Sequence, residues 1–236
     1  MNSFFGLFAK VIGPVLTLIY KLVQNYGLSI IILTLIIRLC LIPLYAKQMK
    51  YTAKMGEIQP VIKDIQTRYA SNRERMNEEM QKIYKEYDIS PTSGCLPMLI
   101  QMPIIFGLFM LLRTPLTYMT EPMMVSAVHE GFLWVADLCQ PDAWILPLLA
   151  GASTYFTFSA NQETDATGMM NGMKYFYPIL IFLIGRSFPS GLALYWAIGN
   201  VLTIFQNIYF NKKRKAEKLQ KEAEAEVIKK RKAEAK

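Results

Sequence analysis

Three long runs of residues without a charged side chain constrain the fold more than any other feature of this sequence. They cover residues 89–112, 143–162 and 187–211 and are 24, 20 and 25 residues long. A helix of roughly 20 apolar residues is enough to cross the ~30 Å hydrocarbon core of a bilayer. Three such runs in a chain of 236 residues, 53% of them hydrophobic, predict an all-α integral membrane protein.

Two further segments complete the predicted set of membrane spans. Residues 22–46 carry a single charge, on Arg38, and residues 175–185 form a short apolar run between Lys174 and Arg186. The short run is sufficient only if its helix starts several residues earlier and both basic side chains reach toward the interfaces. We therefore predict five transmembrane helices, at about 27–46, 93–112, 143–160, 169–187 and 191–210.

The distribution of charge predicts the orientation of these spans. The net charge is +8, and of the 26 Lys and Arg residues nine lie in 47–85 and eleven in 212–236. The segment 114–142 has no basic residue and four acidic ones. Basic loops stay in the cytoplasm under the positive-inside rule. We therefore expect an outer loop at 114–142, cytoplasmic segments at 47–88 and 212–236, an N-terminus outside and a C-terminus inside.

Residues 1–25 form a separate amphipathic segment. Helical periodicity places Lys10, Thr17, Lys21 and Gln24 on one face. The opposite, apolar face contains Phe4, Phe5, Phe8, Val11, Ile12, Val15, Leu16, Ile19, Leu22 and Val23. This pattern predicts a helix lying in the membrane interface, and the alternative is a sixth span. We expect no cleavable signal peptide, because a basic region and a small-residue cleavage site are missing before Lys21.

Two matching apolar stripes predict that residues 47–88 fold as an antiparallel helical hairpin. The spacing +4, +3, +4 occurs twice, in Ile58, Ile62, Ile65 and Tyr69 and again in Met76, Met80, Ile83 and Tyr87. Residues 70–72 would form the turn, and the alternative is a solvated charged loop. The basic tail at 212–236 is expected to extend the last helix and then fray into a disordered segment.

Arg38 is the residue with the clearest functional implication. At 1.5 Å per residue it lies roughly 13 Å inside the level of Lys47. A central Arg costs ~2.5 to 3.5 kcal/mol on insertion scales. The other predicted spans contain no acidic residue that could pair with it. The sequence therefore indicates a hydrated cavity at membrane depth, and the alternative is a structural Arg bonded to free backbone carbonyls.

Several polar residues of the spans are candidates for lining this cavity. Thr34 lies four residues before Arg38, on the same helical face. The other candidates are Gln101, Ser153, Thr154, Thr157 and Asn200. Each of them could equally be an ordinary packing residue, since small polar side chains are common between membrane helices.

Motifs for enzymatic chemistry are missing from the sequence. It contains no HExxH, GxSxG or Walker loop and no pair of intramembrane Asp residues. Cys40, Cys95 and Cys139 have no metal-ligand spacing, and we expect no structural disulfide among them. We therefore expect a protein that is not an enzyme and that uses no metal or cofactor.

Four segments in this order resemble the YidC-type membrane protein insertases, over about residues 4–211. They are Thr34–Arg38, Gln59-Pro60, the run 94–103 (GCLPMLIQMP) and the run 188–196 (FPSGLALYW), followed by Gly199-Asn200. The resemblance implies five helices around a hydrophilic groove that is open to the cytoplasm and to lipid. It also implies that Arg38 is the groove arginine and that Thr34 and Trp196 lie on the groove wall or contact the substrate.

The resemblance further implies a function in the bacterial cell (inner) membrane. The chain looks like the short, Gram-positive form of the family, and nascent membrane proteins would be its substrates. A ribosome bound through the basic tail, membrane lipids and possible cooperation with the Sec translocon are the other expected partners, and DNA is not one. The alternative functions are a small-solute transporter or channel, and an assembly scaffold.

Overall fold

The computed structural model describes residues 2–89, 96–119, 121–160 and 168–234, and the predicted all-α fold is confirmed over these residues. The helices are α1 (Asn2–Val23), α2 (Tyr26–Cys40), α3 (Ile42–Arg68), α4 (Arg73–Glu86), α5 (Leu96–Arg113), α6 (Pro115–Tyr118), α7 (Met123–Ala127), α8 (Ile145–Ala160), α9 (Gly168–Gly185) and α10 (Ser190–Glu234). Cys95 and the predicted connections at 90–95 and 161–167 lie outside the described residues.

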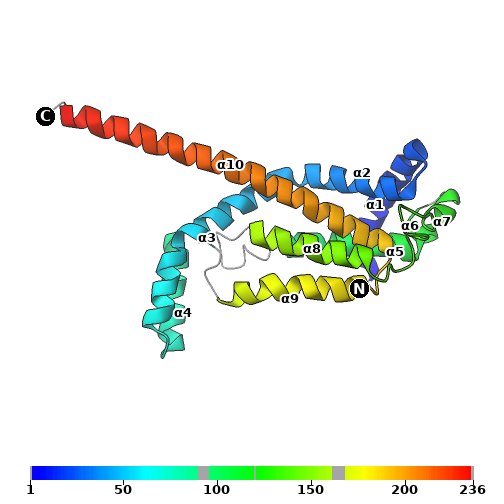
Figure 1. The fold of residues 1–236 in the computed structure, drawn as a ribbon, viewed down its shortest axis with the longest axis horizontal. Coiled ribbons are helices and arrows are strands. Elements are labelled where there is room, and N and C mark those ends of the chain that lie inside the picture. The colour runs from blue at the N-terminus through cyan, green and yellow to red at the C-terminus, as the bar shows by residue number, and fades with distance from the viewer. Residues whose placement is uncertain (1, 90–95, 120, 161–167, 235–236) are drawn as a thin grey trace.

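The long helices form a bundle from which two arms project (Figure 1). α2, α8, α9 and the first half of α10 lie alongside one another, and α10 packs against both α2 and α8. The α3–α4 hairpin and the C-terminal half of α10 leave the bundle at one end. α6 and α7 lie at the opposite end. The two segments predicted to be cytoplasmic therefore project from the same end of the bundle.

Helix α1 is present as predicted, but it does not have a single apolar face. One side packs against α5 and α2 and buries Ala9, Ile12, Leu16, Ile19 and Tyr20. The opposite side exposes Leu7, Val11, Leu18 and Leu22. The assignment of Thr17 to the polar face was wrong, because it is buried and its hydroxyl donates to the Gly13 carbonyl at 2.9 Å. The periodicity could not separate two apolar sides that have different neighbours.

Helix α2 is shorter than the span predicted at about 27–46. α2 ends at Cys40, and after Leu41 a new helix, α3, continues to Arg68 at an angle of 57° to α2. Pro43 lies in the first turn of α3, where its missing N–H is tolerated. Proline in a continuous helix would block the hydrogen bond to the carbonyl four residues earlier, which explains the break.

The segment predicted to form a hairpin, 47–88, contains most of α3 and all of α4, which pack together with a turn at residues 69–72. Its small core contains Ile58, Ile62 and Ile89, against which Met55, Met80, Ile83 and Tyr84 pack. Tyr87 does not take the predicted place in this core, because it is 42% exposed. α4 ends at Glu86, so the helical period no longer applies to Tyr87.

Helix α10 is longer than the predicted fifth span. The helix predicted at 191–210 begins at Ser190 and continues without a break through the basic tail to Glu234. The expected fraying into a disordered tail is therefore not found over the described residues. Ala, Glu and Lys dominate this segment and are strong helix formers.

Length and composition alone do not identify five membrane spans in this structure. One described helical segment, Phe5–Val23, is long and apolar enough to cross a bilayer, and the bent pair α2 and α3 qualifies if it forms one span. Three shorter apolar segments are Gln101–Arg113, Ile145–Ser159 and Lys174–Gly185. The qualifying helix is the one predicted to lie in the interface, and the five-span arrangement stays a prediction.

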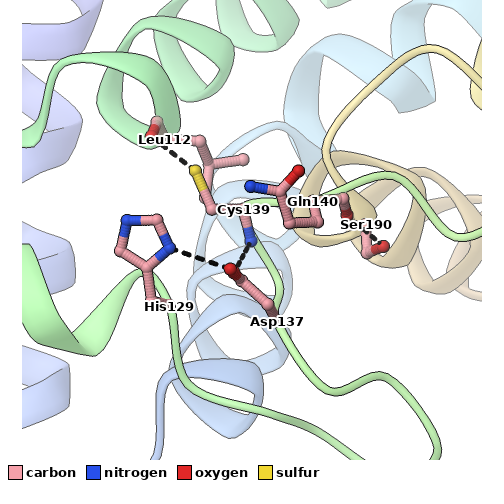
Figure 2. Close-up of polar contacts among 6 residues, drawn as sticks. All are labelled: Leu112, His129, Asp137, Cys139, Gln140 and Ser190. Atoms are coloured by element: carbon pink, nitrogen blue, oxygen red, sulfur yellow. Dashed lines mark hydrogen bonds and ion pairs between the residues drawn. The ribbon is translucent and has the colours of Figure 1, made fainter.

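The segment 114–142 is folded onto the bundle and includes the short helices α6 and α7. Figure 2 shows Cys139 between two anchors: its N–H donates to Asp137 Oδ1 at 2.7 Å and its thiol to the Leu112 carbonyl at 3.2 Å. His129 Nδ1 lies 2.9 Å from Asp137 Oδ2. Burial and the nearby Asp137 raise the pKa of Cys139 and so favour the protonated thiol. These contacts attach the segment to the end of α5.

The same segment is attached to the start of α10. The Ser190 hydroxyl donates to the Gln140 carbonyl at 2.6 Å, and the Gly191 N–H donates to the Leu138 carbonyl at 2.9 Å (Figure 2 shows the first contact). These bonds use donors at the N-terminus of α10 that have no partner within the helix. The loop therefore caps α10 and fixes the end of the bundle opposite the hairpin.

Candidate functional site

Arg38 lies in the last turn of α2 and its guanidinium packs against the backbone of α10 at Gly199. The position that a Cβ on Gly199 would occupy is 2.8 Å from Arg38 Nη2 and 3.5 Å from Nε. Arg38 is half-buried, and the ion pairs formed between described residues do not include it. Its charge therefore has no carboxylate partner in the part of the chain that the structure describes.

Arg38 is the middle of three regularly spaced contacts between α2–α3 and α10. Ile30 meets Gly191, Arg38 meets Gly199, and the Tyr45 hydroxyl donates to Asn207 Oδ1. The residue numbers rise together on both sides, so the helices run in parallel. The residue on α10 advances by eight at each step, which is 12 Å along a helix. The missing side chains of two glycines allow α2 to approach α10 closely.

Amide side chains bond two tyrosine hydroxyls where α10 packs against its neighbours. Gln101 Nε2, on α5, donates to the Tyr195 hydroxyl at 2.8 Å, and Asn207 Oδ1 accepts from the Tyr45 hydroxyl. Tyr195 lies four residues, about one helical turn, before Gly199, which Arg38 contacts. Gln101 therefore bonds α10 about one turn from the Arg38 contact.

Four polar residues meet on the neighbouring side of α10, where it packs against α8. The Trp196 indole donates to Thr154 Oγ1 at 3.0 Å. The Asn200 amide donates to Thr154 Oγ1 at 2.8 Å and to Ser153 Oγ at 3.2 Å. Ser153 and Thr154 are buried and also bond the Ala150 carbonyl. The structure therefore brings Trp196 and Asn200 together with two of the five other lining candidates, Ser153 and Thr154.

Thr34 and Thr157 are placed differently. Thr34 is fully buried and its hydroxyl donates to the Ile30 carbonyl of its own helix at 2.7 Å. The Thr157 hydroxyl likewise donates to the Ser153 carbonyl at 2.9 Å, and the residue is half-buried one turn beyond Ser153. Both hydroxyls are satisfied locally, and their predicted contact with a substrate stays a prediction.

An apolar crevice opens beside this polar region. Residues of α5, α8, α9 and α10 line it: Ile105, Ala150, Ile181, Ile184, Gly185, Phe188, Leu192, Ala193 and Trp196. Its volume is about 40 Å³ and its walls are almost entirely apolar. Trp196 is the link between the two environments, because its ring lines the crevice and its N–H joins the polar cluster with Thr154.

Sequence reasoning did not select Tyr45, Tyr195, Gly199 or Asn207 as site residues. Asn207 extends a stripe on α10 that begins at Trp196 and continues through Asn200 and Thr203, with the spacing +4, +3, +4. Asn207 is fully buried, and its Nδ2 has no hydrogen-bond partner in the structure. This polar spacing inside an apolar run was the signal that could have identified Asn207. The contact of Arg38 with Gly199 depends on which helices pair, and no local pattern encodes it.

The sequence matches known proteins over most of its length. Residues 18–218 match the 60Kd inner membrane protein family. The chain is 40% identical over 233 residues to the membrane protein insertase YidC of Clostridium perfringens, covering 93% of this chain and 94% of the relative. It is 36% identical over 216 residues to the YidC of Nitratidesulfovibrio vulgaris strain DP4. That match covers 89% of this chain and 40% of the relative, so the chain spans less than half of that protein.

The fold also matches a solved structure. A crystal structure of an active YidC insertase, with its first transmembrane domain resolved, superposes with a TM-score of 0.66 at 26% sequence identity. The match covers 89% of this chain and 47% of that chain. The sequence motifs, the family match and the fold therefore agree. The chain belongs to the 60Kd inner membrane protein family, the family of the bacterial YidC membrane protein insertases.

Proposed function

We propose that this protein inserts helices of other membrane proteins by moving their short polar flanks past Arg38 and releasing the apolar segments into lipid. The observation that carries the proposal is the half-buried Arg38 without a carboxylate partner among described residues. The Gln101–Tyr195 pair and the apolar crevice at Trp196 support it. A polar flank would meet the Gln101–Tyr195 pair, and the apolar side chains around Trp196 would face the hydrophobic part of the client.

The free-energy cost of moving a charged flank through the bilayer and the gains that offset it are of similar size, so insertion needs no chemical step. Each Leu or Ile of a client helix contributes about −0.3 to −0.6 kcal/mol on entering the bilayer, whereas one Asp at its centre costs ~2.5 to 3.5 kcal/mol. An Arg about 4 Å from that Asp, at an effective dielectric constant near 20, returns up to ~4 kcal/mol before desolvation. One positioned arginine and water in a hydrophilic groove would remove much of the barrier. The protein would therefore act without being an enzyme.

The proposed arrangement in the membrane has five spans, an N-terminus outside and a C-terminus inside. The basic hairpin and the basic part of α10 project from one end of the bundle, and the acidic segment 114–142 lies at the other, which supports this orientation. The exposed stripe Leu7, Val11, Leu18 and Leu22 on α1 lies near the exposed Lys10 and Lys21. Such a helix suits the interface between headgroups and acyl chains.

Nascent membrane proteins are the proposed clients. The basic C-terminal half of α10 would contact ribosomal RNA or anionic lipid, because clustered positive charge attracts both. Handover from the Sec translocon is a further proposed interaction. An electrostatic mechanism that rests on one arginine favours clients with few spans and short, acidic translocated flanks.

Reconstitution tests the proposal directly. Liposomes that contain only this protein would receive a single-span client with a short acidic N-terminal flank, and protease protection of the flank would report insertion. Insertion above the level of empty liposomes supports the proposed function, and none with folded protein contradicts it. Release of a trapped small solute in the same vesicles would instead favour a transporter or channel.

A further inference from the structure

The guanidinium of Arg38 occupies the space that a side chain on Gly199 would need. The position of a Cβ on Gly199 is 2.8 Å from Arg38 Nη2, 3.5 Å from Nε and 3.6 Å from Cζ. All three atoms belong to the end of one flexible side chain. The closest distance is below the 3.0 Å that real Cβ atoms essentially never show, so any side chain here must displace the charge.

Other helical glycines in the bundle meet different surroundings. A Cβ on Gly191 would lie 3.1 Å from Ile30 Cδ1 and 3.3 Å from a methyl group of Leu112, so that glycine serves apolar packing. A Cβ on Gly172 of α9 would meet no atom of the described residues within 4 Å. Gly199 differs from both, because the charged guanidinium of Arg38 occupies the space where its side chain would be.

We propose that Gly199 is a positioning residue for Arg38: its missing side chain lets the guanidinium lie against α10, about one turn from Tyr195. This inference deepens the proposed function and rests on it. A methyl group at Gly199 would push Nη2 from 2.8 Å to an ordinary contact of at least 3.4 Å, a shift of about 0.6 Å or more. The bundle itself would not have to move, because only the far end of Arg38 is in the way.

The proposal makes an unusual prediction for stability and activity. Ala has a higher helix propensity than Gly, so Gly199→Ala should leave the unfolding midpoint unchanged or raised. Moving a charge from about 4.0 to 4.6 Å from a client carboxylate, at an effective dielectric constant near 20, lowers the insertion rate by about two- to threefold. The larger side chain in Gly199→Leu would fill the space that the guanidinium occupies. Its loss of insertion rate should approach the loss caused by Arg38→Ala.

A double-mutant cycle separates positioning from a general structural effect. Insertion of the acidic-flank client would be measured for wild type, Gly199→Ala, Arg38→Ala and the double variant, with Gly172→Ala as the matched control. We expect Gly199→Ala to slow insertion about two- to threefold in the wild-type background and not at all in the Arg38→Ala background. For a client with an uncharged flank, Gly199→Ala should not change the insertion rate. Equal losses in both backgrounds, or no loss for Gly199→Leu, would overturn the proposal.

A chemical measurement keeps the proposal testable if wild type fails to insert the client. In that case the proposed function fails, but the positioning of Arg38 by Gly199 can still be tested. The reaction of Arg38 with an arginine-specific dicarbonyl reagent would be mapped by mass spectrometry. If the methyl group displaces the guanidinium from α10, Arg38 should be modified faster in Gly199→Ala than in Gly172→Ala. Equal rates would show that Gly199 does not position Arg38.

Discussion

At the scale of single residues, the proposed function rests on Arg38. Its guanidinium stays charged at physiological pH, so its surroundings must supply polar contacts. In the structure the guanidinium lies against α10 at Gly199, and no carboxylate of the described residues forms an ion pair with it. A client carboxylate would therefore meet a positive charge that the protein itself has not compensated.

Asp142 carries a prediction about pH. Its carboxylate accepts from the Trp134 indole at 3.2 Å and from the N–H groups of Trp144 and Leu146, at the start of α8. Burial alone would raise the pKa of Asp142, but these hydrogen bonds outweigh it and lower the pKa below its ordinary 3.8. The ionised form is therefore favoured in the folded protein, as at a helix N-cap.

The lowered pKa of Asp142 sets the pH range over which its hydrogen bonds stabilise the folded protein. A lowered pKa contributes stability that is complete above the ordinary value of 3.8 and is lost as pH falls through the lower folded value. We expect Asp142→Ala to cost about 1 kcal/mol at neutral pH, as for loss of an N-cap. Thermal unfolding in detergent would measure the difference from wild type, which should shrink below pH 4. A difference that is independent of pH would contradict the assignment.

The sequence alone marks Arg38 as a charge inside an apolar segment, because distance along a helix follows from residue number. Its contact with Gly199 could not be predicted in this way. Gly199 is 161 residues away in the chain, and periodicity does not say which helices become neighbours. Thr34 lies on the helical face assigned to it, but its hydroxyl donates to the Ile30 carbonyl of its own helix, a local bond that Thr often makes inside helices.

At the scale of elements, the corner between α1 and α2 depends on one carboxylate from the outer segment. Glu130 accepts from the Tyr20 hydroxyl and, at 2.8 Å, from the Tyr26 N–H. Asn25 caps α2 by accepting from the Leu28 N–H at 2.9 Å. Glu130 therefore connects the end of α1, the start of α2 and the segment 114–142.

We expect Glu130→Ala to lower the free energy of unfolding by about 1.5–3 kcal/mol, because hydrogen bonds to a charged group are lost. Glu121→Ala is the matched control, since the Lys21–Glu121 ion pair is exposed on both sides and is worth about 0–1 kcal/mol. Thermal unfolding of both variants in the same detergent measures the difference. Equal losses would show that Glu130 does not hold the corner.

The basic end of α10 carries a prediction about partners. Deleting residues 212–236 removes eleven basic side chains and should weaken ribosome binding most strongly at low salt, where charges are least screened. Co-sedimentation with ribosomes over a range of salt concentrations measures this. A chain with a neutral helical tail of equal length is the control for loss of the helix itself. Unchanged co-sedimentation after deletion would remove the tail as a ribosome contact.

Helices α5, α8 and α9 could be predicted to within a few residues because each coincides with an apolar run, whereas α10 continues beyond its apolar run into the basic tail. The break between α2 and α3 lies inside a segment predicted as one span, and Pro43 in the first turn of α3 explains it. α6 and α7 were missed because each is stabilised by contacts with the bundle rather than by a period of its own. The two apolar sides of α1 could not be assigned either, because their difference lies in which neighbour covers each side.

At the scale of the whole molecule, the two ends of the bundle differ in charge. One end carries the basic hairpin and the basic half of α10, and the other carries the acidic segment 114–142 (Figure 1). Topology mapping would test the proposed orientation in a background with Cys40, Cys95 and Cys139 replaced by Ser. We expect an impermeant thiol reagent outside intact cells to label a cysteine at exposed Trp134 and not one at exposed Tyr87. Labelling of Tyr87→Cys from outside would contradict the orientation.

The measurement that tests the central claim most directly combines the charge of Arg38 with the charge of the client. Insertion into liposomes would be scored for wild type, Arg38→Lys and Arg38→Ala, with clients that carry an acidic, a neutral or a basic flank of equal length. The account predicts at least a tenfold loss for Arg38→Ala with the acidic flank, corresponding to about 1.4 kcal/mol or more of transition-state stabilisation. It predicts retained activity for Arg38→Lys and little change with the neutral flank. Equal insertion of all three clients by wild type and Arg38→Ala would contradict the claim that Arg38 moves acidic flanks across the membrane.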